Sequence, residues 1–222
     1  MCGRMTRELT AKELIDIFGL LKSVEADPRY NIAPTQETVV IRQTEEGRIG
    51  ESRRWGLIPS WAKDASIAAK TINARAETLS EKPSFRSAFR KCRLLVPATG
   101  YYEWQAQGRA KQPFYIHPTE GGVWAFAGLG EAWQGPEGAV RTFTVITVEA
   151  NPTMAELHPR MPAILPPERW DAWLDPVNED VGVLQGLLTP YSADSMDAYP
   201  VGALVGNVRN DGPDLIKPLV SP

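Results

Sequence analysis

Cysteine stands directly after the initiator methionine in the opening residues MCGR. Initiator methionine is usually removed when a small side chain follows it, so we expect the mature chain to begin with Cys2. Such a terminus carries an α-amine and a thiol on neighbouring carbons, and both groups have a reactive fraction at neutral pH. A 1,2-aminothiol condenses with an aldehyde to an imine, which the sulfur closes into a thiazolidine ring. The alternative is an arbitrary residue at a frayed terminus.

Three further stretches carry side chains suited to acid–base chemistry or anion binding. In TINARAET, Asn73, Arg75 and Glu77 alternate with alanines, so an extended backbone places them on one face. An amide beside a guanidinium can bind an oxyanion or a phosphate. In GYYEWQ, Glu103 lies among aromatic residues, and apolar surroundings raise the pKa of a carboxyl toward neutrality. In ELHPRMPAIL, His158 has a side chain that titrates near neutral pH.

Each of these side chains also has a structural interpretation. TINARAET fits an exposed edge strand, Glu103 fits the solvent face of an alternating strand, and a lone histidine is more often a structural hydrogen-bonding residue. Aromatic and rigid residues beside arginines, in NIAPT and RRWGLIPSWA, resemble a platform on which single-stranded bases stack. Its members are Pro34, Arg53, Arg54, Trp55 and Trp61. Buried tryptophan is the commoner case, and Trp55 before a glycine fits it.

The composition is that of a globular chain without a membrane segment. Its 222 residues, 43% of them hydrophobic, fit a single domain over residues 1–222 with a substantial core. No apolar run approaches the ~18 residues that cross a bilayer, and no signal peptide is evident, so we expect a cytoplasmic protein. Two cysteines without a secretion signal do not make a disulfide framework. The cysteines and histidines lack the close spacing of zinc ligands, so we expect no metal and no cofactor.

The net charge of −3 argues against a protein that coats nucleic acid non-specifically, because such binding depends on neutralising phosphates. A local basic groove remains compatible with it. In KPSFRSAFRKCR the two phenylalanines have helical spacing, so we expect them to face the core and the arginines to face water.

The predicted elements form an α+β domain. TAKELIDIFGLL predicts a helix with a capping box at Thr10 and Glu13. Residues 74–92 are predicted to be mostly helical with an interruption near Pro83, and NPTMAELH and PPERWDAWL predict short helices. Strands are predicted in TVVIRQ, RIGESRRWG, RLLVPA, YYEWQA, PFYIHP, VWAFAGL and RTFTVITVE. Their spacing favours a central antiparallel sheet curling into a barrel or sandwich, with peripheral helices.

The motifs MCGR, YNIAPT, WGLIPSWA, TINARAET, GYYEW, HPRMPAIL and VGNVRNDGPDLIKP follow one another from Cys2 to about Pro218. In this combination the chain resembles the SOS response-associated peptidase (SRAP) domain family. The resemblance implies a compact α+β fold that closes over a positively charged groove. It also implies a monomer that senses abasic sites in single-stranded DNA, with single/double-strand junctions as one setting, and that joins the nucleoid during repair. Cys2 would form a thiazolidine with the ring-opened sugar and so shield the lesion.

The resemblance assigns roles to matching residues of this chain. Asn73 would position the Cys2 end and the opened sugar. Glu103 would be the general acid/base that helps to open the sugar ring, and His158 would assist ring opening and reversal of the crosslink. Arg4 and Arg75 would bind the flanking phosphates. Pro34 and Trp61 would be loop residues that wedge beside the bases. The groove would be made positive by Arg53, Arg54 and Arg160.

Two rival functions fit the same residues. An N-terminal-nucleophile peptidase would activate Cys2 through its own amine or His158, with Glu103 as the orienting group and removal of Met1 as a single turnover. A non-covalent module would hold single-stranded DNA through stacking and arginines alone. We rank lyase- or hydrolase-like crosslinking first, because the aldehyde explains specificity: an intact nucleotide offers the amine no such carbonyl.

Overall fold

The structure is a computed structural model that describes residues 2–22, 24–108 and 110–219. Its larger sheet contains a closed ring of five strands, because β10 pairs with β4 on one side and with β9 on the other. The ring is β3 (Glu37–Gln43), β4 (Arg48–Trp55), β6 (Arg93–Ala98), β9 (Trp124–Gly135) and β10 (Gly138–Glu149). The predicted α+β class with a β barrel is therefore confirmed. The β10–β4 pair is parallel, whereas β9 pairs antiparallel with both β10 and β6.

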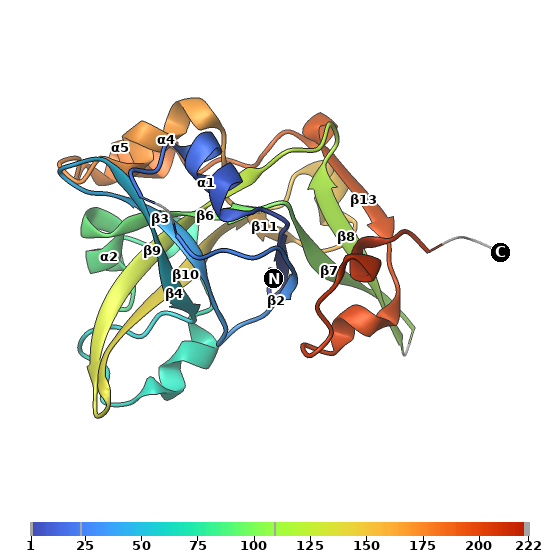
Figure 1. The fold of residues 1–222 in the computed structure, drawn as a ribbon, viewed down its shortest axis with the longest axis horizontal. Helices are drawn as coiled ribbons and strands as arrows, with labels where there is room; N and C mark the ends of the chain where they lie inside the picture. The colour runs from blue at the N-terminus through green and yellow to red at the C-terminus, as the bar shows by residue number, and fades with distance from the viewer. Residues whose placement is uncertain (1, 23, 109, 220–222) are drawn as a thin grey trace.

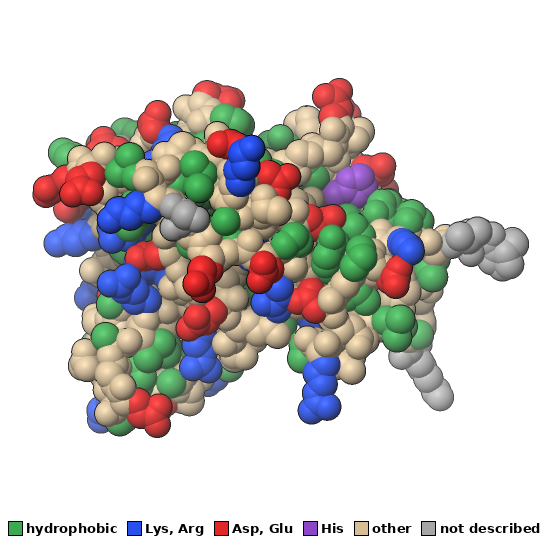
Figure 2. Space-filling view, viewed as in Figure 1, with side chains coloured by type: hydrophobic (Ala, Val, Ile, Leu, Met, Phe, Trp, Pro, Cys, Tyr) green, Lys and Arg blue, Asp and Glu red, His purple; other side chains and the backbone are tan. Residues whose placement is uncertain are grey.

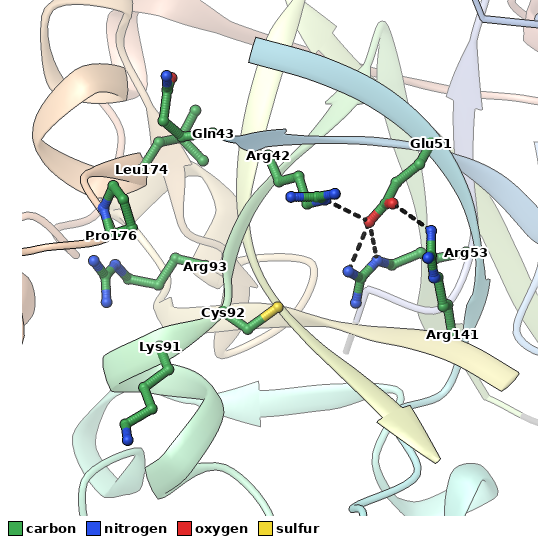
Figure 3. A pocket seen from close by; sticks show the side chains of 10 residues that line it. All are labelled: Arg42, Gln43, Glu51, Arg53, Lys91, Cys92, Arg93, Arg141, Leu174 and Pro176. Atoms are coloured by element: carbon green, nitrogen blue, oxygen red, sulfur yellow. Dashed lines mark hydrogen bonds and ion pairs between the residues drawn. The ribbon is translucent and has the colours of Figure 1, made fainter. Parts of the chain in front are cut away.

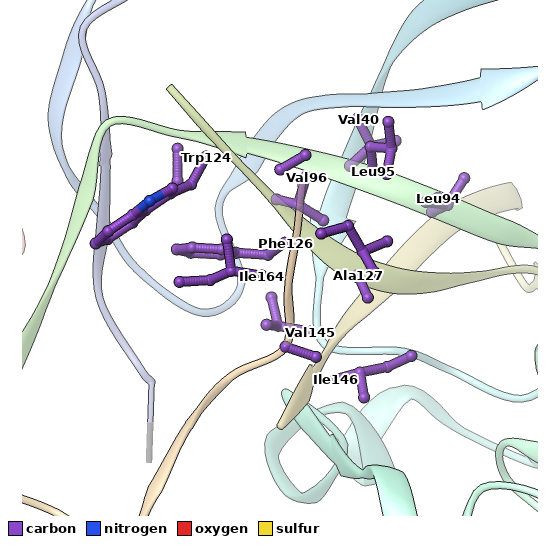
Figure 4. Packing of buried hydrophobic residues seen from close by; sticks show 14 of the residues in the cluster. Val40, Leu94, Leu95, Val96, Trp124, Phe126, Ala127, Val145, Ile146 and Ile164 are labelled. Atoms are coloured by element: carbon purple, nitrogen blue, oxygen red, sulfur yellow. The ribbon is translucent and has the colours of Figure 1, made fainter. Parts of the chain in front are cut away.

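The barrel closes because its strands supply apolar side chains to a common interior. All six residues of β6 are buried, and so are Phe143 to Val148 of β10. Phe126, Val145 and Ile164 are among the side chains that meet in this core (Figure 4). Burial at this density is the main stabilising contribution to the fold, at about 25 cal/mol per Å² of apolar surface.

A second sheet lies beside the barrel and carries the start of the chain (Figure 1). Its order is β13 (Met196–Pro200), β8 (Ala110–Pro118), β7 (Gly100–Gln107), β1 (Met5–Arg7) and β2 (Arg29–Ile32). β7 and β8 form a hairpin around the stretch QAQGRAKQ, whose Arg109 lies outside the described residues. Three short strands extend the barrel sheet: β5 (Asn73–Arg75) and β11 (Arg160–Pro162) on β10, and β12 (Ile164–Leu165) on β9.

The helices are short and lie around the sheets (Figure 1). They are α1 (Ala11–Phe18), α2 (Arg86–Lys91), α3 (Pro152–Ala155), α4 (Trp170–Leu174) and α5 (Val181–Gly186). The 3₁₀ helices are η1 (Ala65–Lys70), η2 (Ala76–Thr78), η3 (Pro167–Arg169), η4 (Ala193–Ser195), η5 (Ala203–Gly206) and η6 (Pro213–Ile216). α1 begins with the predicted capping box of Thr10 and Glu13. No described helix is long and apolar enough to cross a membrane.

The prediction for residues 74–92 is only partly right. α2 forms, with Phe85 and Phe89 buried and Arg86 and Arg90 exposed, as the helical spacing indicated. Residues 74–75 are extended instead, because β5 pairs with β10 in parallel register, Val145 opposite Asn73, and the next residues form the 3₁₀ helix η2. Tertiary pairing here overrides the helix propensity of alanine.

Asn31 ties the C-terminal segment to the second sheet. The side chain is fully buried, and its Nδ2 donates to the carbonyl oxygens of Asn210 at 2.7 Å and Asn207 at 3.1 Å. Its Oδ1 accepts a 2.6 Å hydrogen bond from Nη1 of Arg4, which also donates to the carbonyl of Val205. The amide therefore joins β2, β1 and the segment after η5.

We expect Asn31→Leu to lower the free energy of unfolding by roughly 2–4 kcal/mol, because buried carbonyls and a guanidinium lose their partner. Urea unfolding followed by tryptophan fluorescence measures this, with an unchanged m value showing that cooperativity is kept. Asn207→Ala is the matched control, since that exposed side chain contacts only the local turn, and its effect should stay within about 0.5 kcal/mol. Equal urea midpoints for Asn31→Leu and Asn207→Ala would contradict the role of Asn31 in tying the C-terminal segment to the second sheet.

Candidate active site

Cys2 is enclosed between β5 and β7. Its side chain is fully buried, and its carbonyl oxygen accepts a 2.8 Å hydrogen bond from Nδ2 of Asn73. The next residues are fixed on β7, because Met5 pairs with Tyr101 and the Tyr102 N–H donates to the carbonyl of Arg4. The start of the chain is thus an ordered part of the fold rather than a frayed end. Met1 lies outside the described residues, so its predicted removal stays a prediction.

Glu103 and Tyr101 share the space around the Cys2 sulfur. Glu103 is only 5% exposed, and Tyr101 is 1% exposed on the same strand. Burial raises the pKa of the Cys2 thiol, and the nearby Glu103 carboxylate raises it further. Burial likewise raises the pKa of Tyr101, with added contributions from the charges of Cys2 and Glu103. The thiol is therefore held protonated at neutral pH beside a carboxyl group.

Asn73 presents a second polar atom in this enclosure. While Nδ2 holds the Cys2 carbonyl, Oδ1 is buried and accepts no hydrogen bond from any residue that the structure describes. An acceptor in such a position usually has a partner in the working protein. Its location next to the backbone of Cys2 makes the α-amine released by methionine removal a suitable donor.

His158 follows α3, which begins where Asn151 caps the backbone N–H of Met154 at 2.9 Å. Its Nδ1 lies 3.0 Å from the Arg160 backbone nitrogen, from which it can accept a hydrogen bond, and 3.1 Å from the Arg160 carbonyl oxygen, to which it can donate one. The two contacts need opposite tautomers of the half-buried ring. At 3.5 Å, Nε2 of Gln105 reaches the carbonyl of Glu156, which brings the end of α3 close to the strand that carries Glu103.

Two of the predicted DNA-binding arginines lie around the end of β10. Arg75 is exposed on β5 and pairs with Thr147. Arg160, on β11, makes a bidentate ion pair with Glu77 at 2.8 and 2.9 Å and also donates to the carbonyl of Thr147. The hydrogen bond from Arg160 lowers the pKa of Glu77, and Arg75 contributes to the same shift. Glu77 therefore occupies the fork of Arg160.

Of the other predicted contact residues, Arg4 directly precedes β1, Pro34 lies between β2 and β3, and Trp61 lies between β4 and η1. The Arg4 guanidinium lies over the ring of Trp104 at 5.6 Å. Trp61 is 59% exposed, and Pro34 is half-buried. Thr35 follows it with a φ of 73°, a left-handed conformation that is rare for a β-branched residue. Such backbone strain is usually found at functional sites.

Arg53 and Arg54 are not brought to Cys2 by any described contact. Arg53 is 6% exposed and bonds Glu51 and the carbonyl of Thr142, on the part of β10 that lies away from β5. Arg54 is half-buried on β4. Trp55, considered above as a stacking residue, is fully buried and donates to the carbonyl of Ile72.

Sequence reasoning assigned no role to Tyr101 or Thr35. The period-2 alternation of GYYEWQ was a sufficient signal for Tyr101, since it shares a strand face with Glu103. Nothing in NIAPT predicts a positive φ at threonine. The described residues contain no group of three or more His, Cys, Asp or Glu side chains placed to hold a metal ion.

These features define an α+β protein with a β barrel and an enclosed site around its second residue. The chain belongs to the family described as SOS response associated peptidase (SRAP), whose model matches residues 1–208. It is 45% identical to the abasic site processing protein YoqW of Bacillus subtilis, covering 98% of this chain and 99% of that protein. It is 33% identical to the abasic site processing protein HMCES of Gallus gallus, covering 86% and 66%. A crystal structure of a Bacteroides thetaiotaomicron protein superposes with a TM-score of 0.90 at 28% identity, covering 99% and 100%.

Proposed function

We propose that this chain processes abasic sites in single-stranded DNA by forming a thiazolidine between Cys2 and the ring-opened sugar. The observation that carries the proposal is the enclosure around Cys2. In it, Asn73 holds the Cys2 backbone, and burial together with the Glu103 carboxylate raises the pKa of the Cys2 thiol. The relatives named as abasic site processing proteins support the same substrate. We further propose that residues 1–222 act as one domain and as a cytoplasmic, nucleoid-associated monomer.

The proposed reaction uses the groups in a fixed order. Removal of Met1 frees the α-amine, which attacks the sugar aldehyde to give a carbinolamine. The Glu103 carboxylate takes the protons that leave the nitrogen and passes them to the oxygen, which departs as water and leaves an imine. The thiol then adds to the imine carbon, and its proton passes to the imine nitrogen. The net change joins carbon to nitrogen and sulfur and releases one water, so no cofactor is needed.

The remaining residues serve the DNA. His158 assists opening of the sugar ring and reversal of the adduct. Arg4, Arg75 and Arg160 bind phosphates beside the lesion, while Pro34 and Trp61 wedge beside the neighbouring bases. Arg53 and Arg54 contribute charge from farther away, because neither has a described contact to the Cys2 enclosure.

Glu77→Gln should tighten binding of lesion-free single-stranded DNA about threefold at low salt. The Glu77–Arg160 pair is half-exposed, so breaking it costs less than about 1 kcal/mol, and the freed guanidinium gains a phosphate. Fluorescence anisotropy at two salt concentrations measures this, since an added phosphate contact steepens the salt dependence by about 0.7 in log–log slope. Glu81→Gln, an exposed change in the same loop region, is the control. Equal affinities for parent and Glu77→Gln would remove Arg160 from the DNA contact.

The test of the function is a denaturing gel of protein mixed with single-stranded DNA carrying one abasic site, without borohydride. A retarded band that needs the lesion supports the proposal. A tetrahydrofuran analogue of the lesion also lacks the base but offers no aldehyde, so it should give no band. Intact-mass spectrometry must show that the chain begins at Cys2. No band from such a chain would sink the crosslinking proposal.

The two rivals are outcomes of the same experiment. Retardation on a native gel with both the lesion and its analogue, without a denaturing-gel band, would indicate a non-covalent binding module. Cleavage of peptides supplied in trans, with loss of cleavage in Cys2→Ala, would indicate a peptidase.

A further inference from the structure

A second polar cavity lies at the other end of the barrel from Cys2. It has a volume of about 220 Å³, and its walls include Arg42, Glu51, Arg53, Cys92, Arg93 and Arg141. Arg93, which pairs with Leu129 of β9, lies at the end of β6 next to the cavity. Ala98, at the other end of β6, pairs with Trp124, whose ring contacts Tyr101 of the Cys2 enclosure. Five strand residues separate the two ends, or about 17 Å.

Three arginines converge on one carboxylate in this cavity (Figure 3). Oε1 of Glu51 accepts from Nε of Arg53 at 2.7 Å and lies 3.3 Å from Nε of Arg42, and its Oε2 accepts from Nη1 of Arg141 at 2.9 Å. Burial raises the pKa of Glu51, but the three arginines together outweigh it, so the net shift is downward and the carboxylate stays ionised. One negative charge thus organises three positive ones from adjacent strands.

The arrangement is built into the barrel wall. Arg53 is 6% exposed and lies against β9 at Gly130, where a Cβ atom would collide with its guanidinium. Arg93 is 5% exposed and donates to the carbonyl oxygens of Phe89 at 3.0 Å and Asn178 at 2.9 Å. These acceptors are neutral, and the carboxylates of Asp175 and Glu179 lie near enough to act on the Arg93 charge. Neither carboxylate lines the cavity, so the excess of positive charge inside the cavity remains.

The charge balance and the donor geometry favour one class of ligand. Lys91 completes the lining, which carries five cationic side chains and one carboxylate, a formal excess of four positive charges in a chain whose net charge is −3. Each guanidinium has five N–H donors, and the contacts with Glu51 use one nitrogen of Arg42 and one of Arg141. Arginine forks match the oxygens of phosphate in pairs.

We propose that this cavity binds a phosphate group. Arg42 and Arg141 contact its oxygens, Arg53 and Arg93 supply fixed positive charge, and Glu51 holds the first two side chains in place. The group can belong to inorganic phosphate, to a mononucleotide or to a nucleic-acid backbone, and these sources share the same recognition chemistry. The site is separate from the Cys2 enclosure and does not depend on the proposed crosslinking.

Cys92 provides a reporter within the site. It lines the cavity and is half-buried, and its sulfur points into the space beside the arginines (Figure 3). The chain has only two cysteines, so Cys92 is the sole thiol in a Cys2→Ser background. Its thiolate reacts with a neutral aromatic disulfide such as dithiodipyridine, forming a mixed disulfide and releasing one pyridinethione, which is followed by absorbance.

Inorganic phosphate should slow this reaction at constant ionic strength, by about tenfold when its concentration is ten times its Kd, whereas chloride should not. The double variant Arg42→Gln, Arg141→Gln should lose the protection and keep the reaction. Arg86→Gln, an exposed change on α2 outside the cavity, should keep both. Thermal unfolding of each variant shows that it is folded. Absence of protection in the folded Cys2→Ser chain by phosphate, mononucleotide and oligonucleotide alike, or protection that survives in the double variant, would overturn the proposal.

The source of the phosphate is decided by three parallel titrations. Protection by phosphate or a nucleoside monophosphate alone identifies a small-molecule site. Protection by a single-stranded oligonucleotide alone, without a lesion, identifies a backbone contact that extends the DNA-binding surface around the barrel. Because the Cys2→Ser chain cannot form a thiazolidine, failure here says nothing about the crosslink, and failure of the crosslink leaves this result unaffected.

Discussion

Replacing Cys2 with serine should abolish the stable adduct with abasic DNA while preserving the imine that precedes it. Serine keeps the small side chain that permits methionine removal and keeps the α-amine, but its hydroxyl is a far weaker nucleophile than the thiol. We expect the unreduced band on a denaturing gel to fall at least about 100-fold. Reduction with borohydride should restore a band, because reduction needs only the imine.

Cys92→Ser is the matched control for this result. Cys92 is half-exposed at the far end of the barrel, so its loss should leave the adduct unchanged. An unreduced band of parental strength from Cys2→Ser would show that sulfur takes no part. Loss of the band with and without borohydride, in a Cys2→Ser variant that is folded and starts at residue 2, would show that its α-amine forms no imine with the lesion. That result would contradict the role given to the α-amine.

Most strands were predictable, because each combines a buried apolar run with glycine or proline punctuation. The predicted strands RLLVPA and RTFTVITVE correspond to β6 and the main part of β10. The strand pairing that closes the barrel could not be predicted in this way. It depends on the parallel pairing of β4 with β10, which are far apart in the sequence. The parallel pairing of β5 with β10 likewise made a strand of residues 74–75, the start of a segment with helix-favouring composition.

The candidate site was predictable as a set of residues but not as an arrangement. Period and spacing could place Asn73 and Glu103 on strand faces, yet only the pairings β5–β10 and β1–β7 bring both to Cys2. Arg53 shows the opposite case. Glu51 and Arg53 lie two positions apart on one strand and therefore share a face, which is a local signal for their ion pair.

Counting arginines does not by itself locate a positive groove, because the surface carries mixed charge. Acidic and basic side chains are intermixed on the face drawn in Figure 2. Arg160 is paired with Glu77, and Arg53 is paired with Glu51. An arginine in such a pair binds an anion only if the paired carboxylate can move away or if further positive charges surround the pair. Lysines and arginines in a sequence therefore mark where a basic site can form, and their carboxylate partners decide whether it does.

Glu103→Gln should slow adduct formation by at least about 100-fold, because glutamine has the shape of the carboxyl group but cannot transfer a proton. The same change should make Cys2 react faster with iodoacetamide at a fixed pH. The negative charge of Glu103 raises the pKa of the Cys2 thiol, so removing that charge lowers the pKa and increases the thiolate fraction. Single-turnover gels measure the first effect. Alkylation over a range of pH in a Cys92→Ser background measures the second, as a profile shifted to lower pH.

An unchanged free energy of unfolding in Glu103→Gln separates a chemical role from a structural one. A variant that merely loosened the enclosure would also expose Cys2 and lower the pKa of its thiol, because burial is the largest cause of that raised pKa, but it would be less stable than the parent. Glu131→Gln is the control, since this half-buried glutamate on β9 lies in the half of the strand that pairs with the start of β10, away from Cys2. It should change neither measurement. Adduct formation at the parental rate in Glu103→Gln would assign the proton transfer to another group, and His158 would be the next residue to replace.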